Sequence, residues 1–236
     1  HYIMNSALKR KIINHPLLYK GIVYLANIRY FFNNYSSVKG RNNIITFKEG
    51  VLKKKVQIKI IGNNNSVTIH SNCRFKNTKI IILGSNNCLT LGEKVMVYES
   101  ASFELEGSNT SINIGKNTTI GSANFMIGES DTNINIGEDC MLSRNIILST
   151  SDYHSIISLE TKERINPPKN ITIKNHVWIG YSAYISKGAI IGNNCIVASH
   201  AYVGGKKFKD HTILGGLPAK QLRENINWSR EKLPFK

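Results

Sequence analysis

Aliphatic residues recur at every sixth position in the last third of the chain, at Ile173, Ile179, Ile185, Ile191, Val197 and Val203. Four positions after each of the first five stands a small or medium apolar residue: Val177, Ala183, Ala189, Cys195 and Ala201. A period of six fits neither an α-helix nor a simple alternating strand. It is typical of a parallel β-helix, in which three six-residue units form one triangular rung. We expect each aliphatic anchor to point inward, and each following small residue to lie where two walls converge.

A longer repeat precedes these hexads. The equivalent apolar anchors are Phe47, Ile69, Leu91, Ile114 and Ile136, at steps of 22, 22, 23 and 22 residues. Each step exceeds three plain hexads because it carries a polar turn, as in Gly62-Asn63-Asn64-Asn65. Gly, Asn and Asp tolerate the left-handed backbone that such corners need. The sequence therefore predicts an all-β solenoid with expanded corners in its N-terminal rungs, whose stacking buries one continuous core.

Two segments depart from the repeat. Residues 149–170 interrupt the ladder as a loop excursion, and long loops on ordered scaffolds are usually functional. Residues 5–32 have the apolar spacing of helices, with Pro16 starting a second helix. We expect these helices to pack on the solenoid or on a neighbouring subunit, with contact at a membrane as the alternative. The predicted organisation is a helical segment at 4–43, a β-helix at 44–213 and a closing segment at 214–236.

The formal net charge of +16 implies attraction to an anionic partner, although solubility alone is the simpler explanation. The clusters that could gather an anionic acceptor are Lys53-Lys54-Lys55, Lys76, Lys79, Lys162 and Arg164. A nucleic-acid partner is disfavoured because no basic-aromatic interleaving or recognised motif is present. The cysteines have no metal-ligand spacing, and those at 73, 140 and 195 occupy small buried positions of hexads. No metal is expected.

The start of the chain has no signal-peptide pattern, and no run of about 18 apolar residues predicts a membrane-spanning helix. We therefore expect a cytoplasmic protein, with peripheral contact at the inner membrane left open.

Specific motifs flank and follow the loop. Asp152-Tyr153-His154-Ser155 is followed 24 residues later by Val177-Trp178-Ile179-Gly180, and the hexads end in Gly216-Leu217-Pro218-Ala219-Lys220. In this order, the motifs resemble the left-handed β-helix acyltransferases of the hexapeptide-repeat family. The resemblance is greatest to the sugar and polysaccharide O-acetyltransferase branch, which includes enzymes that modify bacterial capsules and polysialic acid. It is close over about residues 136–223 and extends to 44–135 only as a fold.

The resemblance implies a left-handed coil, a homotrimer with active sites between subunits, and acetyl-CoA as co-substrate. His154 is then the general base for the acceptor hydroxyl, a role suited to imidazole. The backbone N–H of Tyr181 is the oxyanion donor. Trp178 should project outward as a wall for substrate or pantetheine. Asp152 is the nearest candidate to orient His154, whereas His176 and His200 lie in hexad turns, where we expect His176 to be solvated.

For the cofactor, the resemblance places small residues along the groove and cations at the CoA phosphates. The predicted cofactor-binding residues are Trp178, Gly180, Ala183, Ser199, Ala201, Lys206, Lys207, Pro218, Lys220 and Arg223. The expected acceptor is a capsule or O-antigen glycan, favoured as acidic because of the charge, or an activated sugar. The alternatives are acetylation of a small sugar or antibiotic, and a non-catalytic β-helix that binds glycan or membrane.

Overall fold

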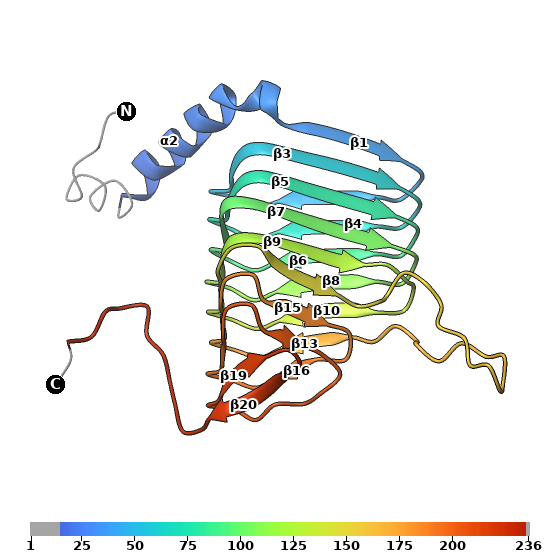
Figure 1. The fold of residues 1–236 in the computed structure, drawn as a ribbon. Coiled ribbons are helices and arrows are strands. Elements are labelled where there is room, and N and C mark those ends of the chain that lie inside the picture. Colours follow the sequence, from blue (N-terminus) through green and yellow to red (C-terminus); the bar gives the residue numbers. More distant parts are fainter. Residues whose placement is uncertain (1–14, 235–236) are drawn as a thin grey trace.

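The computed structural model describes residues 15–234, most of which form a solenoid of stacked parallel strands (Figure 1). Helix α2 (Pro16–Arg29) and the 3-10 turn η1 (Phe31–Asn33) precede the first rung. Pro16 occupies the start of α2, where its missing N–H costs no hydrogen bond, so the predicted helix start is confirmed. The helix expected before Pro16 lies outside the described residues. Within residues 15–234, no helix is long and apolar enough to cross a membrane.

The strands line three walls. The first wall contains β1 (Tyr35–Lys39), β3 (Leu52–Ile61), β5 (Arg74–Leu83), β7 (Met96–Glu106), β9 (Thr119–Ile127), β11 (Met141–Leu142), β14 (Trp178–Ile179), β17 (Ile196–Val197) and β19 (Ile213–Gly216). The second contains β12 (Ile146–Ser149), β15 (Tyr184–Ser186) and β18 (Tyr202–Val203). The third contains β2 (Ile44–Phe47), β4 (Ser66–Ile69), β6 (Cys88–Leu91), β8 (Ser111–Ile114), β10 (Asn133–Ile136), β13 (Ile171–Ile173) and β16 (Ile190–Ile191). In the N-terminal rungs one long strand serves both the first and second walls, because β9 pairs with β11 and then with β12.

The predicted anchors of the long repeat stack directly on one another. Phe47 pairs with Ile69, and the series continues through Leu91, Ile114 and Ile136 along the third wall. The six hexad anchors between residues 173 and 203 are at most 1% exposed, and so are the small residues four positions after them. The core pattern predicted from the sequence is therefore confirmed. Strand pairing nevertheless begins with β1, ahead of the boundary expected at residue 44.

The polar turns of the repeat form a ladder along one edge. Asn42, Asn64, Asn86, Asn109 and Asp131 all have φ between 56° and 60°, the left-handed region that Asn and Asp tolerate. Their side chains are linked in series by hydrogen bonds of 3.0–3.2 Å. The expanded corners are thus fixed both by backbone conformation and by the chain of side-chain contacts between rungs.

The solenoid closes with an antiparallel turn at its C-terminal end. Strand β20 (Ala219–Arg223) pairs with β19, and the following tail returns along the first wall (Figure 1). Trp228 is buried there, and Arg230 donates to the Thr119 hydroxyl at 2.9 Å and the Cys140 carbonyl at 3.0 Å. The tail therefore connects the last part of the chain to rungs whose residues lie about 90 positions earlier in the sequence.

Candidate active site

The loop between β12 and β13 stands out from the solenoid and carries His154 (Figure 1). Its fold depends on Asn166, which is 7% exposed. The Asn166 amide group donates to the carboxylate of Asp152 at 2.7 Å and to the backbone carbonyl of His154 at 2.8 Å. Its carbonyl oxygen accepts from the Ile156 N–H at 2.7 Å and from Arg164 at 3.1 Å. One buried amide side chain therefore holds the backbone on both sides of His154.

A lysine of the next rung fastens the same loop to the solenoid. The ammonium of Lys187, just after β15, lies 2.5 Å from the Asp152 carboxylate and 3.2 Å from the carbonyls of Asn166 and Pro167. Hydrogen bonds donated by Lys187, which has the largest effect, and by Asn166 hold the pKa of the Asp152 carboxyl below its usual value. The loop is consequently anchored by an ionised carboxylate at neutral pH.

A second ion pair closes the outer half of the loop. Arg164 makes a bidentate contact with Glu129, with N–O distances of 2.6 and 2.7 Å. These hydrogen bonds lower the pKa of Glu129. Arg164 was expected among the cations that gather an anionic acceptor, but its guanidinium is already paired with Glu129. Bidentate pairing of this kind supplies geometric rigidity as well as energy.

His154 itself is exposed on the anchored loop. Its backbone N–H donates to the backbone carbonyl of Asp152 at 2.7 Å, in a tight turn in which Tyr153 has a φ of 60°. The Asp152 carboxylate, expected to orient the imidazole, accepts instead from Lys187 and Asn166. Asp152 thus positions the histidine through the loop backbone. An exposed imidazole on a fixed backbone has the accessibility that a general base needs.

Trp178 opens β14 on the first wall and is 37% exposed, which agrees with the outward projection expected for it. It borders a cavity of about 470 Å³ that Tyr98, Arg144 and Arg230 also line. Trp228 of the C-terminal tail lies beside it, with ring centroids 6.1 Å apart. The tail therefore helps to shape the cavity at Trp178, a contribution that the hexad pattern does not reveal.

Tyr181 lies at the corner that follows β14. Its hydroxyl accepts from Asn145 at 3.1 Å, and its ring meets His200 edge-on at a centroid distance of 5.4 Å. Within residues 15–234 the Tyr181 N–H has no hydrogen-bond acceptor, whereas the neighbouring N–H groups of Gly180 and Ser182 are paired. An unpaired backbone N–H at an exposed corner is available to an oxyanion.

His154 and Tyr181 lie at opposite edges of the second wall of one chain. Lys187, which holds the His154 loop, follows Tyr181 by six residues, and six extended residues span roughly 20 Å. Strands β15 and β18 fill the distance between them, with the rings of Tyr184 and Tyr202 stacked at 5.5 Å. Within residues 15–234, no hydrogen bond or ring contact joins His154 to Tyr181.

The predicted cofactor residues divide into two groups. The side chains of Ala183 and Ala201 lie in the core, each 1% exposed, so only their backbone faces outward, and Gly180 is likewise buried. A Cβ at Gly180 would come within 2.7 Å of the Ser199 nitrogen, so this position requires glycine. The exposed members are Trp178, Ser199, Lys206, Lys207, Pro218, Lys220 and Arg223.

The expectation that His176 is solvated was wrong. Its Nδ1 lies 2.7 Å from the Asp139 carboxylate and its Nε2 lies 3.0 Å from the Trp228 carbonyl. The imidazole stacks on the Trp228 ring at a centroid distance of 4.2 Å. The C-terminal tail returns 52 residues later in the sequence to cover this turn, which a local hexad pattern could not indicate.

Comparison with known proteins now adds to this geometry. Residues 170–205 match the family described as "Bacterial transferase hexapeptide (six repeats)". The solved polysialic acid O-acetyltransferase OatWY is 34% identical, with a TM-score of 0.70, and the match covers 84% of this chain and 92% of that one. The chain belongs to the hexapeptide-repeat acetyltransferase family. The polySia-specific acetyltransferase NeuO matches with a TM-score of 0.73 and 29% identity, over 84% of this chain and 83% of that one.

These family members establish the fold as the left-handed β-helix that the motifs implied. The curated relatives match over shorter segments. The polysialic acid O-acetyltransferase of Neisseria meningitidis is 39% identical over 94 residues, which make up 40% of this chain and 44% of that protein. Its counterpart from Escherichia coli O1:K1 / APEC is 36% identical over 92 residues, or 39% of this chain and 30% of that protein. The chain thus matches less than half the length of each.

Proposed function

We propose that this family member is an acetyl-CoA-dependent O-acetyltransferase that modifies a hydroxyl of a bacterial surface glycan, with His154 as the general base. The observation that carries the proposal is the anchored presentation of His154 on the scaffold shared with two polysialic acid O-acetyltransferases. Asn166 and Lys187 fix the loop at both ends, although neither is required to complete the solenoid. A rigidly held, solvent-facing imidazole is what general-base chemistry requires.

The reaction is a direct acyl transfer. His154 removes the proton of the acceptor hydroxyl as the oxygen attacks the thioester carbonyl of acetyl-CoA. The N–H of Tyr181 donates to the oxyanion of the tetrahedral intermediate. Collapse of that intermediate breaks the carbon–sulfur bond, and the proton held by His154 passes to the departing CoA sulfur. No acyl-enzyme is formed, and His154 returns to its neutral state.

The active assembly is a homotrimer in which one subunit supplies His154 and its neighbour supplies Trp178 and Tyr181. The support is geometric: within a chain these residues lie on opposite edges of the second wall. Closed symmetric assembly repeats one interface, so each trimer would contain three equivalent sites. Acetyl-CoA lies between subunits in this arrangement, and the reaction takes place in the cytoplasm, where acetyl-CoA is available.

The cations near the C-terminal end of the solenoid are suited to the CoA phosphates. Lys206, Lys207, Lys220 and Arg223 are exposed, and their side chains have no ion-pair partner within residues 15–234. Unpaired ammonium and guanidinium groups can therefore bind phosphate without first breaking a contact. Ser199 and the backbone near Gly180 lie at the exposed corner that the pantetheine arm would follow.

The proposed acceptor is an acidic glycan of the polysialic acid class. This choice rests on the relatives rather than on the net charge, because Arg164 is paired and residues 93–236 carry 16 basic and 14 acidic side chains. The Escherichia coli chloramphenicol acetyltransferase is 40% identical, but over only 55 residues, or 23% of this chain. That short match does not favour a small-molecule acceptor over a glycan.

The test is release of CoA thiol from acetyl-CoA in the presence of polysialic acid, with dextran as a neutral glycan control. We expect turnover with polysialic acid that falls by ~10²–10⁴ in His154→Ala, the usual contribution of a positioned base. His70→Ala is the matched control, since His70 is an exposed histidine after β4, outside the proposed site, and we expect it to retain most activity. A fully active His154→Ala would refute the assignment of the base.

A further inference from the structure

Helix α2 is attached to the solenoid by one polar face. Lys20 forms an ion pair with Glu49 at 2.8 Å, and Asn27 hydrogen-bonds the backbone of residues at and just before β3 at 3.0 and 2.9 Å. Val23, between them, is 8% exposed. At 100° per residue these three positions share one side of the helix. The contacts that fix α2 in place are therefore mostly polar, the reverse of a usual helix on a core.

The opposite face of α2 is aliphatic and unpartnered within the described residues. Its side chains are between 45% and 76% exposed and comprise Leu17, Leu18, Ile22 and Leu25. Helical spacing places them on one continuous surface that points away from β3. The helix sequence contains no acidic residue. Contiguous exposed aliphatic surface of this kind marks an interaction site.

The net charge is concentrated at the same end of the molecule. Residues 1–92 contain 15 of the 31 Lys and Arg residues but only one of the 15 acidic ones, Glu49, for a net charge of +14. The remaining 144 residues contain 16 basic and 14 acidic side chains, for a net charge of +2. Almost the whole excess charge thus belongs to α2, the first rungs and the residues that precede them.

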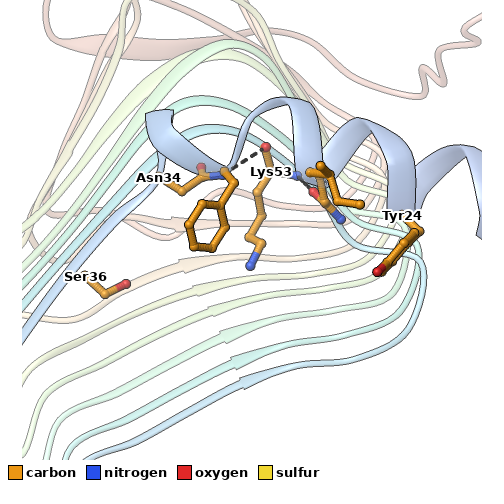
Figure 2. Close-up of a pocket in the computed structure, with 7 residues that line it drawn as sticks. Tyr24, Asn34, Ser36 and Lys53 are labelled. Atoms are coloured by element: carbon orange, nitrogen blue, oxygen red, sulfur yellow. Dashed lines mark hydrogen bonds between the residues drawn. The ribbon is translucent and has the colours of Figure 1, made fainter.

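A cavity beneath α2 combines apolar side chains with a positive charge. It has a volume of about 570 Å³ and is lined by Tyr24, Ile28, Phe31 and Lys53, among others (Figure 2). The Lys53 side chain extends into the space between Asn34 and Tyr24 (Figure 2). Its ammonium also lies 4.2 Å from the centroid of Phe47. Apolar walls around a lysine suit the head and upper chain of an anionic lipid.

We propose that the outward face of α2 docks on the surface of an anionic lipid bilayer. Helices that bind at a bilayer surface combine an aliphatic face with Lys and Arg residues around it. Anionic lipids add electrostatic attraction for each Lys or Arg near the surface. A soluble polyanionic glycan would match the charge but not the aliphatic face. A second copy of the same face would match the aliphatic surface, but the first 92 residues of that copy offer only Glu49 as an acidic partner for 15 Lys and Arg residues.

Docking by α2 leaves the candidate active site clear of the membrane. Strand β3, next to α2, and β14, which carries Trp178, are five rungs apart along the first wall. At ~4.8 Å per rung the two are separated by roughly 24 Å. The enzyme would therefore be held at the bilayer with its site in water, within reach of a growing or membrane-attached glycan.

Vesicle co-sedimentation of the full chain tests the proposal. The probes are phosphatidylcholine vesicles with about one-third phosphatidylglycerol, and pure phosphatidylcholine vesicles. We expect binding to the anionic vesicles only, reduced at high salt, and weakened ~10-fold or more in Leu18→Gln/Leu25→Gln because apolar burial is lost. Leu233→Gln is the matched control: Leu233 is 71% exposed, comparable to 66% for Leu25, and we expect unchanged binding.

The proposal would be overturned by no binding to anionic vesicles, or by equal binding of Leu18→Gln/Leu25→Gln. It would also be overturned if light scattering showed that this variant has a smaller oligomeric state than the wild type. The last result would assign the face to a second copy. Binding to soluble polysialic acid that the same variant abolishes would assign it to the glycan. We expect Leu18→Gln/Leu25→Gln to release CoA thiol at the wild-type rate with a soluble acceptor. Membrane docking and acetyl transfer are thus measured separately, and failure of one proposal leaves the other testable.

Discussion

Replacement of Asn166 by alanine should release the loop that carries His154 while leaving the solenoid folded. The substitution removes four hydrogen bonds, to Asp152, His154, Ile156 and Arg164, at 2.7–3.1 Å. At ~0.5–1.5 kcal/mol each, the ordered loop loses on the order of 3 kcal/mol relative to open conformations. That corresponds to about a hundredfold change in a local equilibrium, because each 1.4 kcal/mol is about a factor of ten.

The assay is steady-state thiol release, with kcat and KM for acetyl-CoA measured separately. Because the loop carries the proposed base rather than the proposed CoA cations, we expect kcat to fall by ~10²-fold, with KM for acetyl-CoA changed little. The melting temperature should change by only a few degrees, since Asn166 lies outside the hexad core. Asn170→Ala serves as the matched control, because Asn170 in the same loop holds Asn133 rather than His154.

Wild-type kcat in Asn166→Ala would refute the idea that this amide positions His154. A parallel loss of activity and of global stability would also count against it, since it would indicate a structural role. Asn166→Asp provides a further discrimination. It retains an acceptor for Ile156 but loses the amide donors and adds a negative charge beside Asp152, so we expect no rescue of kcat.

Three other predictions concern the same region and the core. Lowering the pH through the depressed pKa of Asp152 should detach the loop, because the Lys187 contact is fully present above the ordinary pKa of ~3.9 and is lost as Asp152 protonates. Pepsin should therefore cleave residues 150–170 increasingly below that pH, whereas Lys187→Met should already be cleaved at the upper end of the range in which pepsin is active. Gly128→Ala should lower kcat, because a Cβ would come within 2.5 Å of the Tyr153 ring; an unchanged kcat would show that the ring can move freely. Native protein should expose at most the partly buried Cys88 to a thiol reagent, with all four cysteines reacting after denaturation.

The cysteine prediction follows from burial. Burial raises the pKa of Cys73 and of Cys140 to about 11, so the reactive thiolate is scarce at neutral pH. Rapid reaction of more than one thiol in the native state would mean that the rungs open locally. This measurement also gives the background for any assay that detects released CoA with a thiol reagent.

The sequence predicts the solenoid well because its core is periodic and local. Ile173 and Val203 each occupy an inward position that is repeated in every rung, so burial leaves a regular pattern in the sequence. The polar corners can be predicted equally well, because the left-handed backbone at Asn64 and its equivalents restricts the residue type. Features repeated by every rung can be read without knowing the structure.

The contacts that hold the His154 loop and cover His176 could not be predicted in this way. Asn166 and Lys187 act across 14 and 35 residues on Asp152. Asn166 lies outside the repeat, and Lys187 occupies a turn position of a hexad whose residue type the repeat does not fix. His176 is covered by Trp228, from a tail with no periodic signal. These contacts depend on where non-repeating segments return in space. A buried asparagine at the end of a loop, directly before two prolines, is the one local signal that could have drawn attention to Asn166.

The arrangement of α2 shows a related limit. Leu18 and Leu25 have the spacing of a helix that packs on the solenoid or on a neighbouring subunit. The structure instead uses Lys20, Val23 and Asn27 for attachment and leaves the leucines exposed. An apolar stripe identifies a face that needs a partner, but it does not identify the partner.

The central claim, that His154 of one subunit works with Trp178 and Tyr181 of the next, is tested most directly by subunit complementation. His154→Ala and Trp178→Ala proteins are each purified, shown to be trimers with little activity, then unfolded and refolded together. Mixed trimers contain interfaces that pair an intact His154 with an intact Trp178, so we predict that thiol release with acetyl-CoA and polysialic acid returns to a substantial fraction of the wild-type rate. If mixed trimers form but remain as inactive as the separate variants, the site lies within one chain and the account is wrong.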